Sequence, residues 1–251
     1  MSLLRSIIFT PVAAGLTMIA ATLSALLIWA PASWGITVIR VWRRLFMGAV
    51  SIILGIRYEV RGRDNLPETP VVILSKHQSA WETVALQDVY FPRWLCFVYK
   101  QELHWIPFVG WALYSLPMVA VDRGGGREAL TSLAREGAKR LAEGHHVLVF
   151  PEGTRVAPGA TKRYKIGGAH LAVSAGVKVS PVAHNAGEVW PRNAFVKHPG
   201  KVIISIGPLI DTTGLTAEEV NQRAEAWIEA EMRRISPEHY AGAAGHAATA
   251  S

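Results

Sequence analysis

The sequence predicts an α/β protein: a single domain with a mostly parallel sheet flanked by helices, preceded by an N-terminal transmembrane or re-entrant helical segment. Half of the 251 residues are hydrophobic, which is enough for one sizeable buried core. Short, continuously apolar runs alternate with helix-like stretches, the pattern of strands that are covered on both faces of a sheet. Between Arg5 and Arg40 there is no charged side chain, which predicts the membrane segment.

The elements of the domain follow from these runs. The predicted strands are VVILS at 71–75, LCFVY at 95–99, MVAV at 118–121, VLVF at 147–150, VSPVA at 179–183 and VIISI at 202–206. The predicted helices lie near 79–90, 101–114, 126–143 and 165–175, and a last helix begins at the capping box that starts with Thr216. The domain therefore extends over residues 58–240, and 241–251, which has no periodicity, is expected to be a disordered tail.

Residues 1–57 are predicted to form a membrane-associated helical region. Pro11 and Pro31 bracket an apolar stretch at 12–30, which as a helix would be about 28 Å long, close to a hydrocarbon core of about 30 Å. A cleaved signal peptide is the alternative, because APAS at 30–33 resembles a small-residue cleavage site. The next apolar run, 45–56, is too short to cross a bilayer and suits a helix in the membrane interface or under the domain.

The arginines near this region predict its orientation. Arg40, Arg43 and Arg44 follow the apolar stretch, whereas Arg5 and the amino terminus precede it. This bias places the domain on the cytoplasmic side of the inner membrane, for a single span and for a re-entrant hairpin alike.

Charge and cysteine content narrow the function classes. The chain has 26 Lys and Arg against 19 Asp and Glu, a formal charge of +7, which favours acidic partners such as phosphates, anionic lipid or an acidic carrier protein. Cys96 is the one cysteine, which excludes an internal disulfide framework and a multi-cysteine metal site, and we expect it to be buried. The histidines lack HExxH and zinc-finger spacing, so no metal site is predicted.

The stretch SKHQSAWET at 75–83 follows a predicted strand and has two interpretations. Ser79 and Glu82 form a capping box that explains both residues without catalysis. Alternatively, His77 is a general base and Glu82, one turn into the helix, fixes its tautomer. Ser79 as an acyl-accepting nucleophile is a third option, although the sequence around it lacks the GxSxG elbow.

Two other loops combine glycine with arginine. FPEGTR at 150–155 offers the flexible backbone of Gly153, the hydroxyl of Thr154 and the bidentate donor Arg155, which suits a phosphate, and TKRYK at 161–165 adds cations. VDRGGGREA at 121–129 places Arg123 and free N–H groups at a helix start. The alternative for both is an ordinary loop with solvated arginines.

Together these stretches resemble the glycerolipid acyltransferase family, which carries a His-x4-Asp motif. KHQSAWE looks like its first motif, MVAVDRG its second, FPEGTR its third and GVKVSPVAHN at 176–185, with Pro181, its fourth. KQELHWIPFVG at 100–110 is similar to a further conserved stretch, so the resemblance covers about residues 71–187. Glu82 stands where most members have aspartate.

The resemblance implies a function and a set of site residues. His77 would take the proton from the sn-2 hydroxyl of lysophosphatidic acid, with Glu82 orienting the ring, and the oxygen would attack an acyl thioester to give phosphatidic acid for phospholipid biosynthesis. The substrate-binding residues would be Arg123, Glu152, Gly153, Thr154, Arg155, Pro181 and Lys100, which would help the thioester donor or simply extend to the membrane interface.

The resemblance also implies partners and leaves alternatives. Membrane lipid, lysophosphatidic acid and acyl-CoA or acyl carrier protein are the expected partners, with no cofactor, no metal and no nucleic acid. The same chemistry on another lysolipid, such as a lyso-ornithine lipid, is one alternative. A membrane-anchored serine hydrolase that uses Ser79 with His77, and an anionic-lipid binding module without catalysis, are the others.

Overall fold

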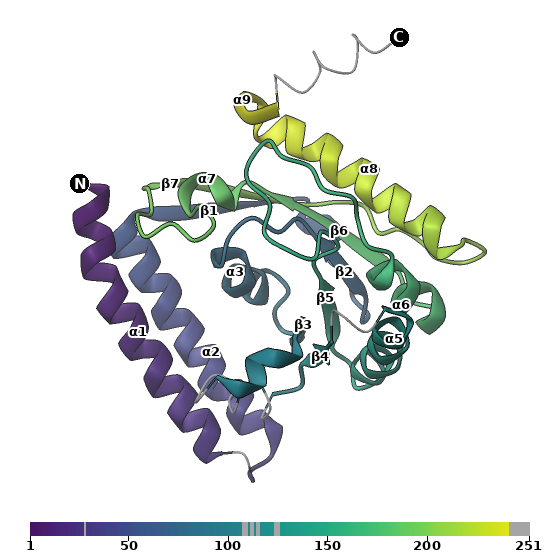
Figure 1. Ribbon diagram of the computed structural model, residues 1–251, viewed down its shortest axis with the longest axis horizontal. Helices are drawn as coiled ribbons and strands as arrows, with labels where there is room; N and C mark the ends of the chain where they lie inside the picture. Colours follow the sequence, from purple (N-terminus) through teal and green to yellow (C-terminus); the bar gives the residue numbers. More distant parts are fainter. Residues whose placement is uncertain (28, 107–109, 111–112, 114–115, 123–125, 241–251) are drawn as a thin grey trace.

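A seven-stranded sheet forms the centre of the protein (Figure 1). The computed structural model describes residues 1–27, 29–106, 110, 113, 116–122 and 126–240. The strands are β1 (Ile56–Arg61), β2 (Val72–Ser75), β3 (Leu95–Lys100), β4 (Val119–Val121), β5 (His146–Val149), β6 (Val179–His184) and β7 (Gly200–Ile206). Their order is β1-β7-β6-β2-β5-β3-β4; β6 and β7 are antiparallel, and the other neighbours in this order are parallel.

Strands β2 to β7 confirm the apolar runs that predicted them, with ends that differ by one or two residues. Strand β1 was not predicted. Its sequence, IRYEVR, alternates apolar and charged residues, which is the pattern of a strand at the edge of a sheet. The strand was missed because its first residue, Ile56, was assigned to the apolar run 45–56, which was interpreted as a helix.

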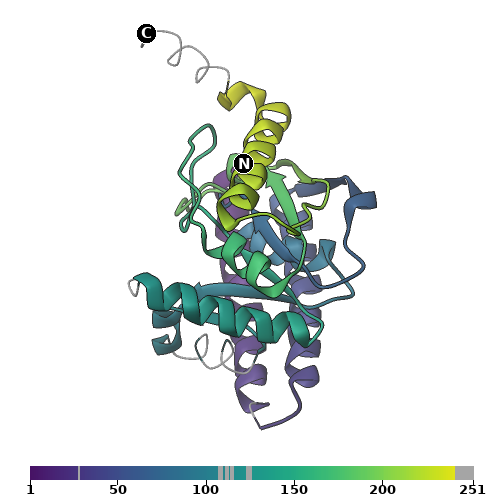
Figure 2. The same ribbon diagram turned by 90° about the vertical axis from the view of Figure 1, so that its right-hand side faces the viewer.

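Helices cover both faces of the sheet, and the strand residues alternate between two cores. On one face α5 (Gly126–Ala142), α6 (Gly167–Ala175) and α8 (Ala217–Ile235) pack against residues such as Val72 and Leu74 (Figure 2). On the other face α3 (Trp81–Val89) and the N-terminal helices pack against residues such as Ile73. The short elements are η1 (Val50–Leu54), η2 (Arg63–Asn65), η3 (Gln101–Trp105), α7 (Ala186–Val189) and α9 (Pro237–Tyr240).

The N-terminal region is a helical hairpin of α1 (Ser2–Leu26) and α2 (Ala32–Ala49) (Figure 1). The predicted helix at 12–30 was therefore misplaced: α1 starts ten residues earlier and continues through Pro11, and Pro31 caps α2. The first half of α1 is held against the domain, because Ser6 and Phe9 are buried there. Residues 45–49 are the end of α2, and η1 follows them. η1 packs under the sheet, which is one of the two placements that the sequence predicted for the apolar run 45–56.

Arg43 does not flank the hairpin as a surface cation, which corrects the count of arginines used for orientation. Its side chain is 6% exposed, Nη2 lies 2.8 Å from Asp88 Oδ1, and Nη1 donates to the carbonyl of Gln87 at 3.0 Å. Arg43 thus ties α2 to α3, while Arg44 is exposed.

Other predictions fall partly outside the described residues. Within 101–114, η3 covers 101–105 as a 3₁₀ helix, whereas 107–109, 111, 112 and 114 are not described. The tail at 241–251 is also outside the described residues. The N-terminal helical region ends with Leu54, and the sheet begins at Ile56.

Cys96 is fully buried in β3, as predicted, and burial raises the pKa of its thiol.

The predicted start of the last helix is confirmed and can be tested. Thr216 Oγ1 accepts the N–H of Glu219, and the Glu219 carboxylate accepts the N–H of Thr216. Thr216→Ala is expected to lower the free energy of unfolding by about 1 kcal/mol, because the first-turn N–H loses its acceptor. Denaturant unfolding in detergent measures it, with exposed Gln222→Ala on the same helix as control. Equal stability of the two variants would contradict a role for the cap.

Candidate active site

The candidate site lies where β2 and β5 end. The two strands are parallel neighbours in the middle of the sheet, so the loops that leave their carboxyl ends meet at one edge. Residues 76–80 connect β2 to α3, and 150–155 follow β5. The first predicted motif and FPEGTR are therefore adjacent in space although they are far apart in the sequence.

His77 and Glu82 are in direct contact. His77 Nδ1 lies 2.7 Å from Glu82 Oε1, with the histidine side chain 15% exposed and the carboxylate fully buried. Because an ionised carboxylate only accepts, Nδ1 carries the proton and donates it to Glu82. This leaves Nε2 as the nitrogen that can take a proton from a bound molecule.

Glu82 also binds the backbone just before α3, so half of the predicted capping box is formed. The other half is not, because the Ser79 hydroxyl accepts the N–H of Trp81 and α3 begins after Ala80 without a side-chain cap. Glu82 Oε1 accepts the N–H groups of Gln78 at 3.1 Å and of Ser79 at 3.0 Å. Burial acts to raise the pKa of Glu82, but the nearby His184, the hydrogen bond from His77 and these backbone donors outweigh it and lower the pKa. The longer side chain of glutamate thus reaches both these backbone N–H groups and the imidazole.

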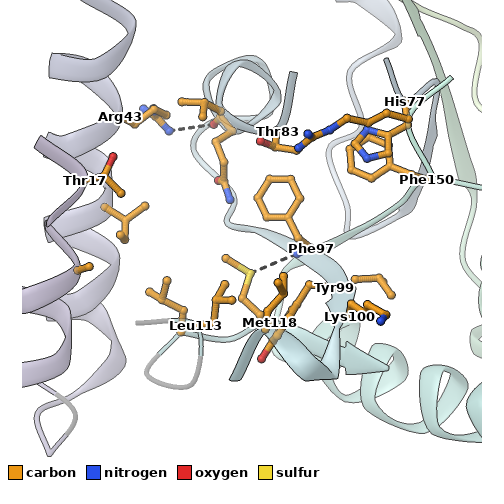
Figure 3. A pocket seen from close by; sticks show the side chains of 18 of the residues that line it. Thr17, Arg43, His77, Thr83, Phe97, Tyr99, Lys100, Leu113, Met118 and Phe150 are labelled. Carbon is orange, nitrogen blue, oxygen red and sulfur yellow. Dashed lines mark hydrogen bonds between the residues drawn. The ribbon is translucent and has the colours of Figure 1, made fainter. Parts of the chain in front are cut away.

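The loop after β5 holds His77 in place. The backbone N–H of His77 donates to Glu152 Oε2 at 2.8 Å, and the carbonyl of His77 accepts the N–H of Val156 at 2.7 Å. The imidazole stacks on Phe150, with 3.9 Å between ring centroids and 15° between planes (Figure 3). Backbone and ring are both fixed, so the imidazole has a defined direction.

A buried charge cluster lies behind His77. Lys76 is fully buried, and its Nζ lies 2.7 Å from Glu152 Oε1 and 2.7 Å from Glu229 Oε1 of α8. Tyr164 also donates to Glu229 Oε1, at 3.0 Å. Burial raises the pKa of Glu152 even though Lys76 and the His77 N–H oppose it. Neither Lys76 nor Glu229 was predicted as part of the site, because their pairing leaves no local pattern.

A cavity of about 650 Å³ opens in front of His77. One wall is the hairpin, with Thr17 of α1 and Arg43 of α2, and the other is formed by α3 and the end of β3, with Phe97 and Tyr99 (Figure 3). Apolar side chains such as Leu113 and Met118 line the part near the hairpin. The polar part contains His77, Thr154, Arg155, Arg192 and Asn193, so the cavity suits an amphipathic molecule with an anionic head.

Three of the predicted substrate-binding residues line this cavity: Thr154, Arg155 and Lys100. Lys100 is half exposed and forms an ion pair with Glu102, with 2.7 Å between Nζ and Oε1. Gly153 borders a neighbouring cavity of about 260 Å³. Its φ of 68° lies in the left-handed region, which glycine adopts without steric strain.

The remaining predicted residues lie elsewhere. Glu152 is fully buried and engaged with Lys76 and the His77 N–H, so it supports the loop and does not line the cavity. Pro181 is paired with Leu74 inside the sheet, away from the cavity. Arg123 lies outside the described residues, and so does most of the glycine run that follows it.

Arg192 and Asn193 were missed by sequence reasoning. They follow α7, and Arg192 Nη1 donates to the carbonyl of Arg155 at 3.0 Å, which joins the two arginine-bearing loops. The dipeptide lies in WPRN at 190–193, which has no phosphate-binding signature. The positive φ of Asn193, 57°, marks a turn that a Pro-Arg-Asn sequence favours.

Ser79 does not have the placement of a nucleophile. It is fully buried, and its hydroxyl accepts the N–H of Trp81, the first residue of α3, at 3.1 Å. Among the described residues, no group of three or more His, Cys, Asp and Glu side chains is arranged to hold a metal ion.

Comparisons with known proteins show the family of the chain. Residues 57–185 match the Acyltransferase family model. The chain is 46% identical over 203 residues to the 1-acyl-sn-glycerol-3-phosphate acyltransferase of Pseudomonas aeruginosa, covering 80% of this chain and 78% of that protein. It is 30% identical over 186 residues to 1-acyl-sn-glycerol-3-phosphate acyltransferase alpha of Mus musculus, covering 73% of this chain and 65% of that protein.

A solved structure has the same fold. The crystal structure of the 1-acyl-sn-glycerophosphate (LPA) acyltransferase, PlsC, from Thermotoga maritima matches with a TM-score of 0.75 over 93% of this chain and 95% of that one, at 24% identity. The family model and the identity to these relatives show that the chain belongs to the acyltransferase family.

Proposed function

We propose that this protein is a 1-acyl-sn-glycerol-3-phosphate acyltransferase, which transfers an acyl group from a thioester to the sn-2 hydroxyl of lysophosphatidic acid and forms phosphatidic acid. The observation that carries the proposal is the contact of His77 Nδ1 with buried Glu82, at the polar end of a cavity that also contains Arg155 and Arg192. The names of the relatives from Pseudomonas aeruginosa and Mus musculus support the same activity.

The chemistry follows from the hydrogen bonds of His77. Nε2 takes the proton of the acceptor hydroxyl while the oxygen attacks the carbonyl carbon of the thioester. The imidazolium that forms is stabilised by the Glu82 carboxylate. Collapse of the tetrahedral intermediate breaks the C–S bond, and the departing sulfur receives the proton from His77. The products are the diacyl lipid and a free thiol, and no acyl-enzyme forms.

Arginines at the polar end of the cavity would hold the phosphate of the acceptor. Arg155 and Arg192 form no ion pair with a residue that the structure describes, so their charges are available for an anion. Thr154 adds a hydroxyl beside them. Arg123 remains a proposed contributor, and the acyl chain would occupy the apolar part of the cavity.

The donor is proposed to be acyl-CoA or acyl carrier protein, acting as co-substrate without a further cofactor. The net charge of +7 favours either one, since both are acidic. Lys100, which lines the cavity, would contact such a donor.

The hairpin is proposed to insert in the cytoplasmic leaflet of the inner membrane, with the domain in the cytoplasm. α1 is long and apolar enough to cross a membrane, and 22% of its most apolar window is buried inside the protein. Large apolar side chains stay exposed along both helices: Leu3, Leu4, Ile7, Ile8, Val12, Met18, Ile19, Leu23, Leu26, Trp34, Val41 and Leu45. Such a continuous face indicates contact with lipid.

The first test is the conversion of lysophosphatidic acid to phosphatidic acid by membranes that contain the protein. His77→Ala is expected to lower kcat by about 10²- to 10⁴-fold, because the general base is lost. The control is His170→Ala, an exposed histidine on α6. A wild-type protein without activity on this acceptor would overturn the acceptor, and full activity of His77→Ala would overturn the base.

The phosphate contacts can be tested by acceptor choice. Arg155→Ala and Arg192→Ala are each expected to raise KM for lysophosphatidic acid by about ten- to a hundredfold, since a charge-assisted hydrogen bond is worth about 1.5–3 kcal/mol. KM for a monoacylglycerol, which lacks the phosphate, should not change. Lys162→Ala, an exposed cation outside the cavity lining, is the control. An equal rise in KM for that variant would instead indicate a general effect of charge.

The membrane contact can be tested with vesicles of mixed neutral and anionic phospholipids. Ile19→Asp puts a charge in the exposed face of α1 and is expected to lower binding by about tenfold or more, because burying an aspartate in lipid is costly. Gln222→Asp adds the same charge on α8, on the far side of the sheet (Figure 1). Unchanged binding of the α1 variant would argue against insertion of this face.

A further inference from the structure

The fully buried ammonium group of Lys76 lies between two carboxylates, 2.7 Å from each, and a buried charge is tolerated only when it is compensated in this way. Glu152 belongs to the loop after β5, whereas Glu229 belongs to α8 at the far end of the chain. The family model ends at residue 185, so Glu229 is outside it.

Each carboxylate has a second contact that matters to the site. Glu152 Oε2 accepts the N–H of His77 at 2.8 Å. Glu229 Oε1 accepts the hydroxyl of Tyr164 at 3.0 Å, and Tyr164 belongs to the basic loop 161–165. One ammonium group therefore links the backbone of the candidate base to α8, and the same helix holds the loop that continues from FPEGTR.

We propose that Glu229 is a positioning residue for acyl transfer, acting through Lys76 and Glu152 on the backbone of His77; the inference rests on the proposed function. With Glu229 in place, Lys76 is held from two sides, and Glu152 keeps one oxygen on the ammonium group and the other on the His77 N–H. Without that charge, Lys76 has a single ionic partner, Glu152, and the balance that sets the orientation of Glu152, and with it of His77, is altered.

Three variants test this coupling in the assay for phosphatidic acid, alongside wild type and His77→Ala. Glu229→Gln keeps the shape and an acceptor for Tyr164, and is expected to lower kcat by about tenfold with KM changed by less than about twofold. Lys76→Met leaves two buried carboxylates facing each other and is expected to lower kcat by about a hundredfold. The double variant removes one of those charges and should recover about tenfold of that loss.

The control is Glu231→Gln on the same helix. Glu231 is buried and contacts Ser205 Oγ and Arg234, at 2.8 and 2.9 Å, so its loss weakens α8 without touching Lys76. It should lower the melting temperature and leave kcat unchanged.

Recovery of kcat in the double variant without a matching recovery of the melting temperature supports positioning, because relief of the repulsion between the two carboxylates would otherwise restore stability and kcat together. The proposal is overturned if Glu229→Gln has wild-type kcat, if the double variant is no better than Lys76→Met, or if Glu231→Gln lowers kcat as much as Glu229→Gln. An inactive wild type would instead overturn the proposed function itself.

Discussion

The turn between β2 and α3 is the constraint on which the site depends. Most of it is buried, so its backbone N–H groups need partners, and the neighbouring strand β6 provides only one of them. The N–H of Lys76 donates to the carbonyl of Val182, that of His77 to Glu152, and those of Gln78 and Ser79 to Glu82. Two acidic side chains therefore close a turn that would otherwise bury unsatisfied donors.

This arrangement explains why the acids around His77 have more than one task. Glu82 satisfies two backbone donors and orients the imidazole with the same oxygen atom. Glu152 completes the turn and compensates Lys76. A residue used in this way cannot be removed without disturbing the backbone that carries the base, so a loss of activity in Glu82 or Glu152 variants has to be separated from a loss of structure.

Much of this was readable from the sequence because local patterns record it. Apolar runs predicted the central strands, and the capping box at Thr216 predicted the start of α8. The spacing of His77 and Glu82 left a helix cap and a catalytic pair both open, and the family resemblance favoured the contact that the structure shows. Edge strand β1 was not predicted, because its alternation of apolar and charged residues directly follows the longer apolar run of α2 and η1.

Contacts between distant residues were not readable. Lys76 and Glu229 are 153 positions apart, and two buried charges that meet through the fold leave no periodicity in either segment. Arg192 enters the cavity from a loop without a motif. Glu152 was expected to bind substrate only through the family resemblance, and the packing shows that its side chain is buried beside Lys76.

The hairpin is a wall of the cavity as well as an anchor. Thr17, Ala20, Ile39 and Trp42 of α1 and α2 face the same space as His77. A version of the protein cut before β1 would therefore not be a soluble enzyme freed from its anchor. It would lack one side of the space for its substrate, and the buried apolar surface that the hairpin now covers would face water. In this fold, solubility and substrate binding cannot be separated by truncation.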